Sequence, residues 1–182
     1  TASCRGSVAR MPVEFGCDIA RFGQDSTVIA IRYDHRVLPL HSMSQRDTME
    51  VAGVIASLAR EHQPVAIKVD VIGIGAGVVD RLRELKFPAV AINVAETARE
   101  PERFMNLRAE LWWNLRERLD PNPRVNPNPI ALPPDDVLLA DLTNVRYKFD
   151  SKGRIQLESK EEIKKRLGRS PDRGDAVVLA FA

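Results

Sequence analysis

The chain has 182 residues, of which 44% are apolar and 29% charged, the composition of an ordinary globular protein with a sizeable core. Its net charge of +2 does not by itself indicate a nucleic-acid partner, and no apolar run approaches the ~20 residues of a membrane span. Two cysteines, Cys4 and Cys17, indicate neither a disulfide framework nor a zinc cluster. We expect residues 1–12 to be a leader, linker or cloning residue and residues 13–182 to form one domain.

The first predicted elements are strands. Val13–Asp18 and Thr27–Tyr33 are short apolar runs bounded by glycine and polar turn residues, as in buried strands. A third strand is predicted over Val37–Met43, which gives an antiparallel meander. An amphipathic helix follows, and Pro64 marks its end.

A βαβ unit is predicted next. Val65–Asp70 is a β-branched run typical of a parallel strand buried on both faces. Glycines in the segment 73–77 turn the chain into a helix, and Ala89–Val94 is predicted as the following strand. These glycines do not match G-x-G-x-x-G, because the sixth position is Val78, so we assign them to close strand-to-helix packing and not to a cofactor.

The second half is predicted to be mainly helical. A helix places four leucines and two tryptophans in one amphipathic segment, and a proline-rich loop follows at 121–134. A short helix, a hairpin at 146–157 and a last helix complete the chain, with Ser170 as the expected cap of that helix. The leucines are Leu107, Leu111, Leu115 and Leu119. The fold class is therefore α/β, a mixed sheet of an antiparallel three-strand meander plus parallel strands, flanked by helices.

Three carboxylates stand at comparable places in this order. Asp18 ends the first strand, Asp70 ends the first parallel strand, and Asp175 lies one turn into the last helix. Ligands of open α/β sheets bind beyond the carboxyl ends of the strands, so the three are expected to meet there and to hold Mg²⁺ or Mn²⁺. Such ions in pairs support phosphodiester hydrolysis. Taken singly, each acid also fits a turn residue or a helix-terminal charge, as do Asp25 and Asp172.

Basic residues gather near the end of the chain. They are candidates for contacts with DNA phosphates, and a solvated helix face is the competing interpretation. Within this group, Lys160 is the residue expected to reach a scissile phosphate. The residues are Lys160, Lys164, Lys165, Arg166, Arg169 and Arg173.

With these residues in view, the sequence resembles the nuclease domain of the phage terminase large subunit, which is RNase H-like. The resemblance rests on GCDIARFGQDSTVIAI, IKVDVIGIGAGVVDRLRE, FMNLRAELWWNLRERL and ESKEEIKKRLGRSPDRGDAVVLAF, which together span most of the chain after residue 12. It implies a metal-dependent endonuclease that cuts double-stranded DNA during genome packaging. By motif position, Asp18, Asp70 and Asp175 match the metal-binding acids, and Asp25 and Asp172 match auxiliary acids.

The resemblance also implies partners and a location. They are two Mg²⁺ or Mn²⁺ ions, double-stranded DNA, an ATPase motor, the phage portal and the small terminase subunit, in the cytoplasm of the infected host. This sequence contains no G-x-x-x-x-G-K-[ST] phosphate loop, so ATP hydrolysis is not assigned to it. We expect the motor to lie elsewhere in a longer protein or in another chain.

Three other functions remain open at this stage. Another RNase H-like nuclease, such as a Holliday-junction resolvase or an integrase, shares the acidic triad. An actin-like ATPase or sugar kinase has a similar first hairpin but needs two such domains, for which 182 residues are too few. A DNA-docking module without activity is the third alternative.

Overall fold

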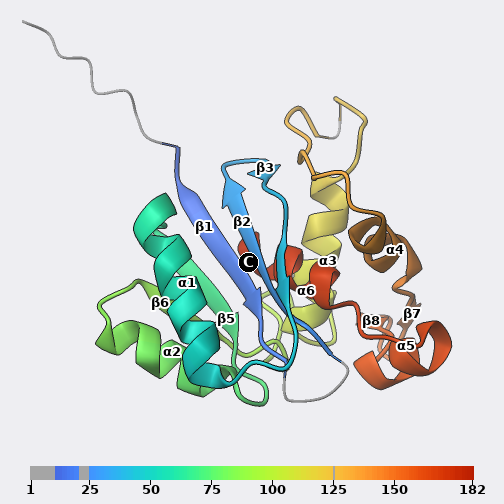
Figure 1. Cartoon of the computed structure of the whole chain (residues 1–182). Helices are drawn as coiled ribbons and strands as arrows, with labels where there is room; N and C mark the ends of the chain where they lie inside the picture. Colours follow the sequence, from blue (N-terminus) through green and yellow to red (C-terminus); the bar gives the residue numbers. More distant parts are fainter. Residues whose placement is uncertain (1–10, 21–24, 125) are drawn as a thin grey trace, which may run out of the picture.

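A mixed β-sheet forms the centre of the computed structural model, which describes residues 11–20, 25–124 and 126–182 (Figure 1). The strand order is β3-β2-β1-β5-β6, and β4 also pairs with β2. The leader predicted at 1–12 lies almost entirely outside the described residues, as does the turn between the first two strands. The predicted fold class is confirmed.

Four strands agree closely with their prediction. β1 (Val13–Asp18) pairs antiparallel with β2 (Thr27–Tyr33), and it pairs parallel with β5 (Ala66–Asp70) on its other side. β6 (Ala89–Ile92) continues the parallel part of the sheet. β1 therefore lies between an antiparallel and a parallel neighbour, buried along most of its length.

The third strand predicted over Val37–Met43 is wrong as a single element. The structure has two short strands instead, β3 (Arg36–Val37) and β4 (His41–Met43), both antiparallel to β2. Pro39 lies between them, and a proline has no N–H to donate to the ladder. The chain therefore leaves the sheet and rejoins it.

Helices cover both faces of the sheet (Figure 1). The helices α1 (Thr48–His62) and α2 (Gly75–Glu84) cover one face. On the other face, α6 (Asp172–Ala180) packs directly against β1 and β2, and α3 (Leu107–Arg118) and α4 (Asp136–Asn144) pack against α6.

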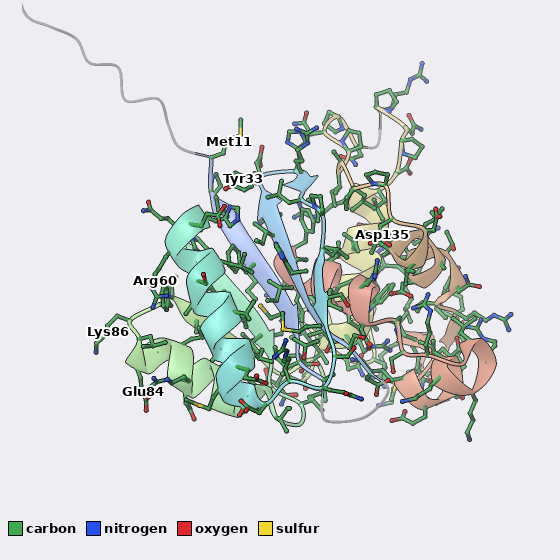
Figure 2. All side chains as sticks on the ribbon, viewed as in Figure 1. Met11, Tyr33, Arg60, Glu84, Lys86 and Asp135 are labelled. Atoms are coloured by element: carbon green, nitrogen blue, oxygen red, sulfur yellow. The ribbon has the colours of Figure 1, made fainter. Side chains whose placement is uncertain are left out.

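Charged residues mark the outer surfaces of these two layers. Arg60, Glu84 and Lys86 are exposed on the α1 and α2 side, and Asp135, the half-buried cap of α4, lies on the other side (Figure 2). Between them, two apolar clusters fill the space on either side of the sheet. The leucines of α3 join the second cluster, which confirms the predicted helical face.

The predicted hairpin is also present. It consists of β7 (Tyr147–Phe149) and β8 (Ile155–Leu157), and α5 (Lys160–Leu167) follows at once, started by a capping box of Ser159 and Glu162. The described part of the proline-rich loop has no helix or strand, and Ala131 ties it to the edge of the sheet by exchanging backbone hydrogen bonds with residues 35 and 37. Among the described residues, none of the helices has the length and apolar character needed to cross a membrane.

Candidate active site

Parallel pairing of β1 and β5 places two of the predicted acids at one edge of the sheet. Asp18 and Asp70 end these strands and are 6% and 7% exposed. The backbone turns sharply after β5, where the Asp70 carboxylate accepts a hydrogen bond from the N–H of Ile72 at 2.9 Å. A Cβ at Gly75 would lie 1.8 Å from the carbonyl oxygen of Asp70, so glycine is needed for this close start of α2.

The third acid arrives on α6. A Cβ at Gly16 of β1 would lie 2.1 Å from the carbonyl oxygen of Ala176, so the helix backbone rests directly on the strand. This contact brings Asp175, the residue before Ala176, to the end of β1, where it is 7% exposed. Strand pairing and one glycine contact therefore bring Asp18, Asp70 and Asp175 to the same end of the sheet, as the sequence predicts.

The start of α6 is held differently from the prediction. Ser170 does not cap the helix, because its hydroxyl donates to Asp25 Oδ1 at 3.1 Å. Instead, Oδ2 of Asp141, which is fully buried on α4, accepts from the backbone N–H groups of Arg173 and Gly174, each at 3.1 Å. A neighbouring helix thus satisfies the first N–H groups of α6, and the Ser170 cap prediction is wrong.

A lysine ammonium group lies between the acids. Lys160 Nζ is 2.9 Å from Asp175 Oδ2 and 3.4 Å from both oxygens of Asp18. A pocket of about 380 Å³ opens here, lined by Asp18, Asp70 and Lys160 among others. We call Asp18, Asp70, Asp175 and Lys160 the acid cluster.

Burial and charge set the ionisation of this cluster. Burial raises the pKa of Asp18 to about 8 and also raises the pKa of Asp70 above its ordinary value. Burial raises the pKa of Asp175 as well, but Lys160 and Arg108 outweigh it and bring this pKa below its ordinary value. Burial likewise lowers the pKa of Lys160, which Asp175 and Asp18 overcome, so that this pKa rises. At neutral pH, Asp175 and Lys160 are therefore charged, whereas burial favours the protonated form of Asp18.

As the side chains lie, no three acidic, histidine or cysteine side chains of the described residues are arranged to hold a metal ion. The ammonium of Lys160 lies against the oxygens of Asp18 and Asp175 that would bind one. Oδ2 of Asp175 is buried and accepts no hydrogen bond of good geometry from the described residues. An acceptor in that state, with two further carboxylates beside it, fits a hard divalent cation if the lysine withdraws.

The two auxiliary acids lie beside this cluster. Burial raises the pKa of Asp172, whose Oδ2 accepts from the backbone N–H of Ser26 at 2.9 Å. Asp25 lies 2.8 Å from Lys164 Nζ; burial raises the pKa of Asp25, but hydrogen bonds from Lys164 and Ser170 outweigh it, and the net pKa is lowered. Lys160 and Lys164 stand one turn apart on α5, so this helix delivers one ammonium group to Asp18 and Asp175 and a second to Asp25.

The other predicted DNA contacts are mostly paired with carboxylates. Lys165 is exposed, and the three arginines each form an ion pair within the described part of the chain. The pairs are Arg166 with Glu158, Arg169 with Asp141, and Arg173 with Asp135.

Two residues of the site were not predicted as part of it. Both lie on α3, four positions apart and hence on one face: Arg108 and Trp112. The indole N–H of Trp112 donates to Asp175 Oδ1 at 2.8 Å, and Arg108 Nε is 3.6 Å from the same oxygen. A polar residue one turn before a core tryptophan was the only available signal for Arg108.

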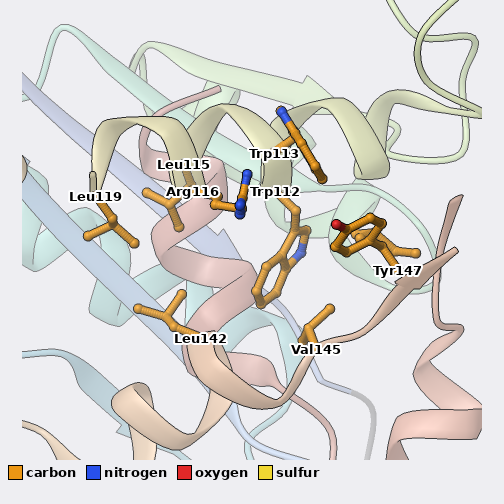
Figure 3. A pocket seen from close by; sticks show the side chains of 9 residues that line it. Trp112, Trp113, Leu115, Arg116, Leu119, Leu142, Val145 and Tyr147 are labelled. Carbon is orange, nitrogen blue, oxygen red and sulfur yellow. The ribbon is translucent and has the colours of Figure 1, made fainter. Parts of the chain in front are cut away.

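The ring of Trp112 also lines a separate pocket of about 130 Å³ between α3, α4 and the hairpin (Figure 3). Its other walls are mainly apolar and include Leu115, Leu142, Val145 and Tyr147. No carboxylate lines this pocket, so the acid cluster is the candidate active site.

Comparison with solved structures places this arrangement in one fold. The nuclease domain of the large terminase subunit gp2 of bacterial virus Sf6 is similar at a TM-score of 0.82 and 24% identity, covering 96% of this chain and 89% of that one. A variant of the Sf6 domain solved with manganese gives a TM-score of 0.82 at 23% identity, and it covers the same shares of the two chains. No protein-family model and no curated protein matches the chain.

A second phage domain has the same fold. The large terminase nuclease of thermophilic phage G20c, solved with bound magnesium, gives a TM-score of 0.70 at 16% identity, covering 95% of this chain and 82% of that one. The chain therefore has the RNase H-like fold of phage large terminase nuclease domains.

Proposed function

We propose that this chain is a divalent-metal-dependent endonuclease that hydrolyses phosphodiester bonds of double-stranded DNA. The observation that carries the proposal is the convergence of three buried aspartates, far apart in sequence, at one end of the sheet, where Lys160 lies against two of them. Burial of several carboxylates together is unfavourable, because each resists ionisation beside the others. A site of this kind is of use when a cation compensates the charge.

Asp18, Asp70 and Asp175 would hold Mg²⁺ or Mn²⁺, and two ions per site is the stoichiometry we propose. When bound, the metal supplies stabilisation of the negative charge that develops on the phosphate. Lys160 then exchanges its carboxylate partners for a phosphate oxygen. Asp25 and Asp172 keep the neighbouring loop and the start of α6 in place, through Ser170 and the backbone N–H of Ser26.

The biological setting we propose follows the solved structures of the same fold. The substrate is phage DNA during packaging, cut in the host cytoplasm. The ATPase motor of a large terminase, the portal and the small subunit are the proposed partners. Lys165 and the hairpin β7–β8 are the proposed contacts with DNA beyond the scissile phosphate.

Plasmid cutting tests the proposal directly. We expect Mn²⁺-dependent nicking and linearisation of supercoiled plasmid by the purified chain, and none in EDTA. Asp70→Asn and Asp175→Asn should each reduce the rate by about 100-fold or more, since even indirect partners of a metal ligand contribute 10–100-fold. Asp80→Asn is the matched control, because this exposed aspartate lies on α2 away from the cluster.

Substrate shape separates the proposal from its rivals. Linear duplex, supercoiled plasmid and a four-way junction are compared at equal phosphate concentration. A strong preference for the junction would favour a resolvase instead. Equal cutting by the parent chain and both variants would mean that the acid cluster is not the active site, and DNA binding without any cutting would indicate a docking module.

A further inference from the structure

Arg108 is the most unusual side chain near the acid cluster. Its Nη1 donates to the backbone oxygen of Glu158 at 2.9 Å. Its Nε and Nη2 are buried and have no hydrogen-bond partner among the described residues. Burying an unpaired donor costs free energy, so two of them on one guanidinium call for a functional explanation.

Other donors in this part of α3 are already used. The backbone N–H of Arg108 donates to Val94, and that of Ala109 donates to the Asn106 cap. Trp112 donates to Asp175 Oδ1. Of these groups, the guanidinium alone retains unused N–H donors.

The two unused donors lie on the same edge of the guanidinium. The Nε and Nη2 groups form a planar fork of two N–H donors, which can engage two oxygens or share one. The nearest carboxylate oxygen to this edge is Asp175 Oδ1, 3.6 Å from Nε, which is just too far for a hydrogen bond. On the other side of the carboxylate, Lys160 Nζ lies 2.9 Å from Oδ2.

Asp175 is therefore shared between two cations of different character. Lys160 is a flexible point charge at the mouth of the pocket, with a side chain 34% exposed. Arg108 lines the same pocket, has a side chain 13% exposed, and is held by the backbone oxygen of Glu158 and the ring of Trp112. Of the two, the lysine is the more exposed, so we expect the lysine to withdraw and the arginine to stay.

We propose that Arg108 is a positioning residue: when Lys160 leaves, the Nε and Nη2 edge takes up Asp175 Oδ1 and leaves Oδ2 facing the metal site. Trp112 acts on the same oxygen from the side. This inference rests on the proposed function, because it assigns a role to Asp175 as a metal ligand. It adds a specific claim, that a guanidinium which orients a ligand carboxylate strengthens metal binding despite its positive charge.

That claim has an electrostatic alternative of opposite sign. A guanidinium that merely lies near a divalent cation repels it, so its removal would tighten metal binding. A guanidinium that orients a ligand carboxylate does the reverse, as partners of metal ligands commonly do by 10–100-fold. The sign of the change separates the two.

Manganese affinity is measured without DNA, by calorimetry or by the paramagnetic signal of free Mn²⁺. We expect Arg108→Lys, which keeps the charge but not the planar fork, to weaken Mn²⁺ binding about 10-fold, and Arg108→Ala to weaken it further. Trp112→Phe should weaken it less than additively when combined with Arg108→Lys, because both donors act on one oxygen. Arg116→Lys is the matched control on the exposed face of α3 and should change nothing.

Each outcome bears on one claim. Unchanged or tighter Mn²⁺ binding by both Arg108 variants, folded by thermal unfolding in EDTA, overturns the positioning role. Unchanged Mn²⁺ binding with weaker binding of a short duplex in EDTA also overturns it, and assigns Arg108 to a phosphate. If the parent chain binds Mn²⁺ no better than Asp175→Asn, the proposed function fails first and the inference falls with it.

Discussion

The two ends of α6 carry clusters of the same kinds of charge, arranged in opposite ways. At its C-terminal end, Glu14 lies between Arg32 and Lys68, with Arg32 Nη2 at 2.7 Å. Lys68 also donates to the backbone oxygen of Ala182 at 2.6 Å, and Arg32 Nε to that of Ala180 at 2.5 Å. Cations therefore satisfy the carbonyl groups at the helix end, as they commonly do. We call Glu14, Arg32 and Lys68 the C-terminal charge cluster.

At the N-terminal end, the acid cluster leaves its groups incompletely satisfied. The buried side-chain atoms without a hydrogen bond of good geometry in the described residues are Arg108 Nε and Nη2 and Asp175 Oδ2, and all three lie there; the last is held by Lys160 as an ion pair. Local incompatibility of this kind costs stability and is typical of functional sites. The comparison indicates that the C-terminal charge cluster stabilises α6. The acid cluster is instead arranged for a ligand, and binding of that ligand stabilises the cluster.

The largest effect we expect is on stability at the C-terminal charge cluster. Glu14→Ala leaves Lys68 buried without its carboxylate, and breaking a buried pair in this way costs about 3–5 kcal/mol. Urea unfolding measures the loss. Lys68→Met in addition should restore much of it, because the unpaired cation is then replaced by an apolar chain of similar length.

Cutting activity sharpens this prediction. The fraction of Glu14→Ala that stays folded should cut DNA at nearly the parent rate, since the cluster lies at the far end of α6. A loss of stability below about 1 kcal/mol, or a folded variant without activity, would contradict the division of roles between the two ends.

In the acid cluster, removal of a carboxylate should raise the stability of the metal-free protein instead of lowering it. Burial raises the pKa of Asp18 from 3.8 to about 8, so the folded protein keeps a proton that the unfolded chain loses between these values. The stability of the metal-free parent therefore falls as pH rises from about 4 to 8. Asp18→Asn lacks this penalty and should gain about 2–4 kcal/mol over the parent at pH 8, and almost nothing at pH 4, since one pKa unit is worth about 1.4 kcal/mol before relaxation.

Asp25→Asn is the control with the reverse expectation. The pKa of Asp25 is lowered on balance, so its contribution to stability is present above the ordinary carboxylate pKa and is lost at lower pH. This variant should be less stable than the parent at neutral pH. Denaturant unfolding in EDTA at four pH values measures both differences, and a constant difference for Asp18→Asn across that range would refute the assigned ionisation.

The fold and the three central acids were predictable because each depends on a short local pattern. β1, β2 and β5 are apolar runs, and parallel pairing of β1 and β5 brings Asp18 and Asp70 to one edge whatever the details of packing. Asp175 was predictable from the capped start of the last helix, although its cap comes from Asp141 and not from Ser170. Long-range partners of this kind leave no mark at the capped residue.

The ion pairs of the basic residues could not be predicted from the sequence for the same reason. Lys160, Lys164 and the arginines were predicted to contact DNA because basic residues close together in sequence suggest a basic surface. The structure pairs them with carboxylates from other segments, such as Asp25 and Asp141, whose positions depend on tertiary packing. Arg108 was missed because an arginine in an amphipathic helix is usually a solvent-exposed residue, and only the fold buries it against Asp175.

The smallest effect we expect distinguishes paired from exposed lysines on α5. Lys165 is exposed, whereas Lys164 Nζ lies 2.8 Å from Asp25. A lysine that neutralises a phosphate releases a counterion, and its loss lowers the slope of log affinity against log salt by about 1. Lys165→Ala should lower the slope by this amount, and Lys164→Ala should lower it by less, because the charge of Lys164 is already partly neutralised by Asp25.

Fluorescence anisotropy of a labelled duplex in EDTA, at salt concentrations from about 50 to about 200 mM, measures both slopes. Equal losses in the two variants would show that Lys164 leaves Asp25 when DNA binds, and no loss in either would restore the interpretation of α5 as a solvated face.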